Sequence, residues 1–122
     1  MMDNGAKPLI KEDKKWYILS FNSQDSRFRK KQRGIESEGY LLIKSLARDD
    51  FLEKKWSDLY KDTYPKSYIS DPGKAKAKLM TGVIKNVNKK LKKDFGGKVR
   101  IEKTKIGEMG DSIDAFQLKW KL

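Results

Sequence analysis

The chain has 122 residues, and its 29 Lys and Arg exceed its 17 Asp and Glu to give a formal net charge of +12. It contains neither Cys nor His, which excludes disulfides, thiol nucleophiles, thiolate metal sites and imidazole chemistry. One folded domain is expected, because the chain has single-domain length and carries three Trp, five Tyr and five Phe.

The N-terminal part combines a polar arm with a strand and a basic segment. Residues 1–14 are polar and contain Gly5 and Pro8, which predicts a flexible arm ahead of a domain spanning 15–122. Residues 15–21 are aromatic and β-branched and predict a strand. Residues 22–34 are polar and basic, and they fit either a loop or the second half of a hairpin.

Two short helices are expected next. Ser37 is a suitable N-cap for a helix that runs through Ala47. A second helix is predicted from Phe51, with Asp49 or Asp50 as its N-cap, since apolar residues follow at helical spacing. It should end before Tyr64, because a residue that precedes proline avoids the helical conformation.

A long basic helix is the clearest element. Residues 70–73, Ser-Asp-Pro-Gly, form a strong start signal, and the helix should continue to about Asp94 and end at the glycines 96 and 97. At 100° per residue, its apolar face would contain Met80, Ile84, Val87 and Leu91, flanked by Ala77 and Val83. Between 73 and 93 it carries eight Lys and no acidic residue. The helix should therefore present one face to a core and the opposite face to an anion.

The C-terminal segment predicts a β-hairpin. Residues 98–104 and 112–120 alternate between apolar and polar side chains, and the turn at 105–111 contains two glycines.

This order of elements is typical of a winged helix-turn-helix domain. The run Met80-Thr-Gly-Val-Ile-Lys-Asn-Val-Asn-Lys-Lys-Leu91 resembles the recognition helix of the OmpR/PhoB-type DNA-binding domain. Residues 39–47 and 50–56 resemble that family's first two helices, and 99–104 and 115–120 resemble its wing strands. The family's Arg-Gly-x-Gly-Tyr wing sequence is absent from 105–111, and no receiver domain is expected ahead of the first helix.

The resemblance implies an α+β fold: three helices, an N-terminal strand or hairpin, and a C-terminal β-hairpin wing. It also implies double-stranded DNA as the partner, and a helix of this width fits the major groove. The residues expected to face the duplex are Thr81, Gly82, Lys85, Asn86 and Lys89. Those expected near phosphates are Lys74, Lys76, Lys78, Lys92 and Lys93. A second set of contacts would come from Arg27, Arg29, Lys30, Lys31, Arg33, Lys103 and Lys105, although a solvated loop or an acidic protein surface fits the 27–33 cluster equally well.

Several single residues have two readings. Gly82 costs about 1 kcal/mol of helix propensity, which fits either close approach to a duplex or tight packing. The aromatics on apolar stripes, Trp16, Trp56, Phe116 and Trp120, are expected in the core rather than stacked on bases. Tyr64 and Tyr68 are expected to be exposed in a polar loop. In the family that the chain resembles, this loop contacts RNA polymerase.

Other functions compete with DNA binding. The basic surface could bind an acidic protein, such as RNA polymerase or a replication factor, or bind RNA, or merely keep the protein in solution. The acidic residues Asp49, Asp50, Glu53, Asp111 and Asp114 are spaced as caps and turns rather than as a two-metal nuclease site, so no enzyme, metal or cofactor is expected.

We therefore expect a small transcriptional regulator that acts as a monomer or as a weak or tandem dimer on DNA. Its expected location is the cytoplasm, in association with the nucleoid. No membrane partner is expected, because no apolar run approaches the roughly 18 residues of a membrane span.

Overall fold

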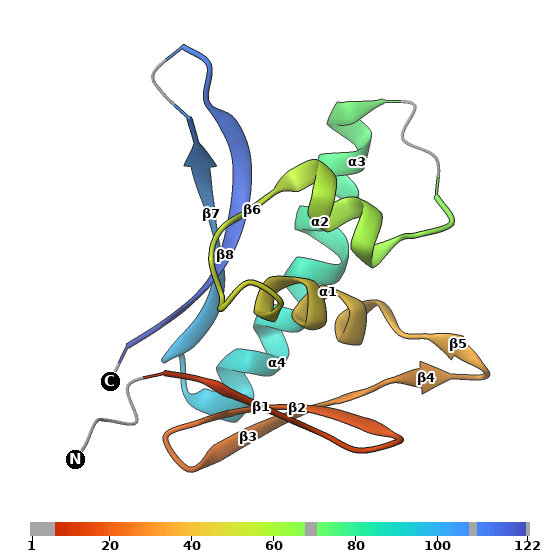
Figure 1. Ribbon diagram of the computed structural model, residues 1–122, viewed down its shortest axis with the longest axis vertical. Coiled ribbons are helices and arrows are strands. Elements are labelled where there is room, and N and C mark those ends of the chain that lie inside the picture. The colour runs from red at the N-terminus through yellow and green to blue at the C-terminus, as the bar shows by residue number, and fades with distance from the viewer. Residues whose placement is uncertain (1–6, 68–70, 108–109, 122) are drawn as a thin grey trace.

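The computed structural model describes residues 7–67, 71–107 and 110–121, and it confirms an α+β fold built on antiparallel sheets (Figure 1). Strands β1 (Leu9–Glu12), β2 (Trp16–Phe21) and β3 (Gln24–Arg29) form one sheet in the order β1-β2-β3. The strand expected at 15–21 is confirmed as β2, and the segment after it forms a hairpin rather than a loop. The prediction of a flexible arm over 1–14 is wrong for β1, which pairs with β2.

A second hairpin, β4 (Lys31–Gln32) and β5 (Ile35–Glu36), leads into helix α1 (Glu38–Ala47). Ser37 occupies the predicted N-cap position of α1, but its side chain does not cap the helix. The Ser37 hydroxyl instead donates to the Arg29 carbonyl oxygen and so fixes the hairpin to the end of β3.

Helix α2 (Trp56–Thr63) starts later than the sequence predicts. Neither Asp49 nor Asp50 caps it, because Asp50 and Phe51 both adopt positive φ angles and the chain then forms strand β6 (Lys54–Lys55). Phe51 is buried against Trp120, with ring centroids 5.7 Å apart, and its carbonyl oxygen accepts a hydrogen bond from Gln117 at 3.1 Å. This long-range packing overrides the helical spacing of the apolar residues. The predicted end before Tyr64 is confirmed.

The long helix consists of α3 (Pro72–Lys78), the π-helical turn η1 (Leu79–Ile84) and α4 (Lys85–Phe95). Its predicted start is confirmed, because Asp71 Oδ1 accepts from the backbone N–H groups of Gly73 and Lys74 at 2.9 and 3.3 Å. Its predicted end is confirmed by Gly96, which adopts a left-handed conformation.

The apolar face of this helix differs from the prediction in its N-terminal half. Met80 is 40% exposed and Ala77 is exposed, whereas Leu79 and Ala75 are buried. Hydrogen bonds from i to i+5 make a wider turn than those of an α-helix, so η1 accommodates an additional residue and changes which side chains reach the core.

The C-terminal strands β7 (Val99–Ile106) and β8 (Ile113–Trp120) confirm the predicted hairpin. Strand β6 pairs with the other edge of β8, so the sheet order is β6-β8-β7. Among the described residues, no helix has both the length and the apolar character that crossing a membrane requires.

Two polar contacts hold α4 between the sheets. Asn88 donates from Nδ2 to the Ile101 carbonyl oxygen at 3.0 Å and accepts from the Ile101 N–H at 2.8 Å, which joins α4 to β7. On its other side, Ser26 of β3 donates to Asp94 at 2.6 Å. The helix therefore has a fixed rotation about its axis, and its outward face is set by the fold.

Candidate nucleic-acid interface

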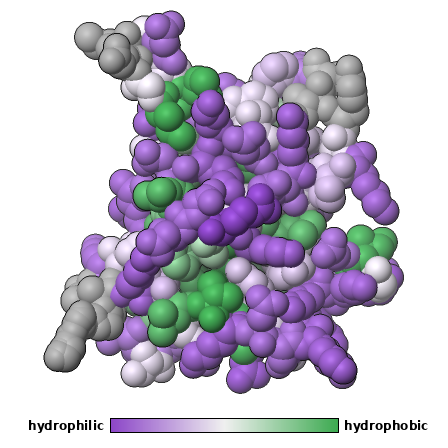
Figure 2. Space-filling view, viewed as in Figure 1, coloured by the Kyte–Doolittle hydropathy of each residue, from purple (hydrophilic) through white to green (hydrophobic). Residues whose placement is uncertain are grey.

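The predicted DNA-facing residues of the long helix lie mainly on its outer surface. Lys74, Lys78, Thr81, Lys85, Asn86, Lys89, Lys92 and Lys93 are exposed, and Lys76 and Gly82 are half-buried. Figure 2 shows that hydrophilic side chains cover most of the face in view and separate its small apolar areas. The structure thus brings these residues together along one helix.

Two lysines of this helix are engaged by carboxylates. Lys76 lies 3.4 Å from Asp114 of β8, which also receives Lys103 of β7 at 3.7 Å. Lys90 lies 3.5 Å from Asp94. Within the described part of the chain, the helix's other six lysines (Lys74, Lys78, Lys85, Lys89, Lys92 and Lys93) form no ion pair. Lys76, one of the predicted DNA contacts, joins the helix to the hairpin, and Lys103, another, forms its ion pair within the hairpin.

Asp114 forms ion pairs with both Lys76 and Lys103. Its partial burial raises the pKa of the carboxyl, but Lys103 and Lys76 outweigh that effect and hold the pKa below its ordinary value. Asp114 is therefore ionised at neutral pH and neutralises part of the positive charge near α3.

The region around Gly82 is organised by Tyr64. Tyr64 is buried, so the prediction of an exposed contact there is wrong, and Tyr68 lies outside the described residues. The Tyr64 hydroxyl donates to Glu38 at 3.2 Å, and burial together with Glu38 raises the pKa of Tyr64 well above its usual value. Lys78 lies 4.1 Å from the centre of the Tyr64 ring. A Cβ added to Gly82 would meet the Tyr64 hydroxyl at 3.9 Å, an ordinary contact, so packing does not require glycine there.

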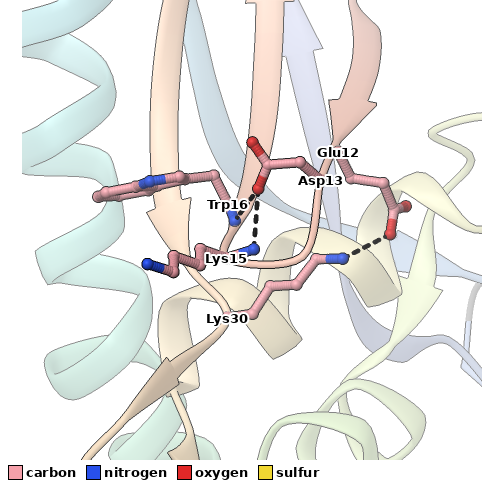
Figure 3. A network of polar contacts seen from close by, with 5 residues as sticks. All are labelled: Glu12, Asp13, Lys15, Trp16 and Lys30. Atoms are coloured by element: carbon pink, nitrogen blue, oxygen red, sulfur yellow. Dashed lines mark hydrogen bonds and ion pairs between the residues drawn. The ribbon is translucent and has the colours of Figure 1, made fainter.

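The second set of predicted contacts lies in three places: beside β1, around a groove, and on the C-terminal hairpin. Lys30 lies beside β1, where it donates to Glu12 at 2.8 Å, and this bond raises the Lys30 pKa (Figure 3). In the adjacent turn, Asp13 accepts from the N–H groups of Lys15 and Trp16, both at 2.8 Å, and these bonds lower the pKa of Asp13. This network fixes the turn from which Trp16 projects.

The remaining basic residues of the 27–33 cluster surround an open groove of about 1200 Å³ between β3, the β4–β5 hairpin and the long helix. Its basic lining residues are Arg27, Arg29, Lys31, Arg33 and Lys90, and its acidic ones are Glu36 and Glu38. Phe28, Val83 and Val87 form its apolar floor. Lys105, the last of the predicted contacts, is exposed on β7, outside this groove.

Trp16 belongs to this groove, so the prediction that it lies in the core is wrong. The indole extends from β2 toward α4 (Figure 3), and the Arg29 guanidinium lies 5.5 Å from the centre of its ring. The alternation of β2 could have revealed this, because Tyr17, Leu19 and Phe21 share one face of the strand and Trp16 belongs to the other. The other three aromatics, Trp56, Phe116 and Trp120, do pack in or against the core.

Of the acidic residues considered for a nuclease, Asp49, Asp50 and Asp114 are engaged in ion pairs, whereas Glu53 and Asp111 form none among the described residues. Asp49 pairs with Lys54 at 3.6 Å, and Asp50 pairs with Lys7. Asp111 follows the turn of the C-terminal hairpin. Within the ranges that the structure describes, no group of three or more carboxylates is arranged to hold a metal ion.

Comparison of the chain with protein-family models, with curated proteins and with solved structures found no match. The described part of the chain has two cationic surfaces, the outer face of the long helix and the groove, and they differ in chemistry. The helix face carries only lysine, whereas the groove carries three arginines beside a tryptophan.

Proposed function

We propose that this chain is a double-stranded DNA-binding protein of winged helix-turn-helix architecture and acts as a small transcriptional regulator at the nucleoid. The supporting observation is the row of six lysines on the exposed side of the long helix, which form no ion pair among the described residues. The order of elements supports the architecture, because α1, α2 and the long helix precede a hairpin whose strand β8 also pairs with β6.

The dimensions of the helix suit the major groove. Pro72–Phe95 extends over roughly 36 Å at 1.5 Å per residue, and a helix is about 10–12 Å across, against a groove width of about 12 Å. Asn86 is suited to reading adenine, and Lys85 or Lys89 to donating to guanine. Lys74, Lys78, Lys92 and Lys93 would neutralise phosphates. Lys76 is left out of this set because Asp114 already engages it.

The residue types predict how binding depends on sequence and salt. Lysine is a hydrated point charge and lacks the planar fork with which arginine recognises guanine, so sequence discrimination should be modest. Neutralising phosphates releases counterions from DNA, so affinity should fall steeply as salt rises. The protein would therefore bind many sequences and prefer some of them.

A charge-reversal experiment tests this function. The variant Lys85→Glu/Lys89→Glu should lose at least about a hundredfold in affinity for a short duplex, measured by fluorescence anisotropy at low salt. The matched control Lys11→Glu/Lys61→Glu changes two exposed lysines on β1 and α2 and gives the same net charge. It should lose only a few-fold. Equal losses in the two variants would show that binding follows net charge alone and would contradict the proposal.

A further inference from the structure

The groove beside α4 contains most of the chain's arginines. The sequence contains five arginines, and Arg27, Arg29 and Arg33 line this one groove, whereas the long helix has none. Guanidinium groups bind phosphates with two parallel hydrogen bonds and also stack on flat rings. Arg27, Arg29 and Arg33 are all exposed. The groove therefore offers several phosphate-binding groups that the fold itself does not use up in ion pairs among the described residues.

The groove also contains groups that suit a nucleobase. The half-buried Trp16 indole extends toward α4 (Figure 3), and Asn86 of α4 also lines the groove. An indole provides a face for base stacking, and an amide provides both a donor and an acceptor for base edges. Ile35, 72% exposed near the tip of the β4–β5 hairpin, adds apolar surface at the rim.

We propose that this groove binds an unpaired nucleic-acid strand, with its phosphates on the arginines and a base against Trp16. A cationic groove with an aromatic platform is the arrangement by which proteins hold single strands without strong sequence preference. The volume of about 1200 Å³ exceeds the roughly 300–1000 Å³ typical of small-molecule pockets, and the groove is open, which favours a polymer. Acidic side chains would pair with the arginines but cannot stack on the Trp16 indole, whose protein neighbour is the Arg29 guanidinium at 5.5 Å.

This site goes beyond the proposed duplex contact and can exist without it. Lys85 and Lys89 do not line the groove, and Trp16, Arg29 and Arg33 are not on the long helix. The two surfaces adjoin at Asn86. A duplex on the helix face and a single strand in the groove would thus be neighbours on one molecule.

The experiment titrates the full chain with an oligothymidylate of about ten nucleotides, a length within the range that single-strand sites occupy. The variant Trp16→Ala should weaken this binding about tenfold and leave duplex affinity within twofold of the wild type. Trp16→Phe should retain most of the oligothymidylate affinity, because phenylalanine also stacks. It should lose most of the quenching of tryptophan fluorescence that we expect when the wild type binds.

A second variant guards against misfolding of Trp16→Ala, which circular dichroism would reveal. Arg29→Gln/Arg33→Gln removes two exposed charges from the groove, and Arg48→Gln/Arg100→Gln removes two exposed arginines elsewhere. The groove variant should lose about tenfold more affinity for oligothymidylate than its control.

Oligothymidylate binding that is equal in the groove variants and their controls would overturn the proposal. So would displacement of oligothymidylate by poly-glutamate at equal concentrations of charge, which would indicate an acidic peptide. The outcome for the duplex is separate. If Lys85→Glu/Lys89→Glu loses duplex binding but keeps oligothymidylate binding, both sites stand, and if it keeps duplex binding, only the duplex proposal fails.

Discussion

The salt dependence of duplex binding follows from the ion pairs of the long helix. Eight lysines lie between residues 73 and 93, and Lys76 and Lys90 are engaged by carboxylates, which leaves six whose charge can displace counterions from DNA, whether they contact a phosphate or a base edge. With about 0.9 counterions released per neutralised phosphate charge, the slope of log affinity against log salt should be about −5.4. Raising salt from about 50 to 200 mM should therefore weaken binding roughly a thousandfold.

The variant Lys85→Gln/Lys89→Gln removes two of these charges, so the magnitude of the slope should fall by about 1.8 and the slope should become about −3.6. Lys76→Gln is the matched control, because Asp114 already neutralises Lys76, and its slope should stay within about 0.5 of the wild type. Anisotropy titrations at several salt concentrations measure all three slopes. If Lys76→Gln reduced the magnitude of the slope by as much as each substitution in the double variant does, Lys76 would contact DNA. That result would refute the conclusion that Asp114 of the hairpin already neutralises Lys76.

Three predictions concern stability. Leu79→Ala should lower the free energy of unfolding by about 3 kcal/mol and Met80→Ala by less than about 1 kcal/mol, because only Leu79 is buried. Urea unfolding measures both values, and a larger loss for Met80→Ala would contradict the π-helical register. Asn88→Ala should cost about 2 kcal/mol in the same assay, because the backbone N–H and carbonyl of Ile101 lose their partner, and a cost near zero would show that the link to β7 is dispensable. Burial raises the pKa of Tyr17 from 10.0 to about 12, so the folded state favours the neutral phenol. The contribution of this preference to the stability of the folded protein is complete below pH 10 and should be lost between pH 10 and about 12. Tyr17→Phe should remove that part of the alkaline loss, and an identical pH profile would count against it.

Local signals predicted much of the fold. The Asp71 cap, the terminating Gly96 and the alternation in β7 and β8 act over a few residues, and each appears where the sequence indicates. The delayed start of α2 was not predictable in this way. The start of α2 depends on the packing of Phe51 against Trp120, a residue near the C-terminal end of the sequence.

The candidate site was also predictable only where it depends on neighbours in the sequence. The lysines of the long helix are exposed as expected, because a helix with a buried stripe must place its charges outside. The pairing of Lys76 with Asp114 joins residues 38 positions apart, and the placement of Trp16 beside α4 depends on how a sheet meets a helix. The alternation of β2 indicates that Trp16 lies off the core face, but sequence spacing shows neither that α4 lies beside it nor that Lys76 pairs with Asp114.

The π-helical turn η1 also determines where this helix can differ in length. The twelve steps from Leu79 to Leu91 would rotate a regular α-helix about 120° beyond three full turns, whereas eleven steps would leave an excess of only about 20°. A chain lacking one residue between 79 and 84 could thus keep the same core contacts in an uninterrupted α-helix. We expect a relative that lacks this π-helical turn to be one residue shorter between positions 79 and 84.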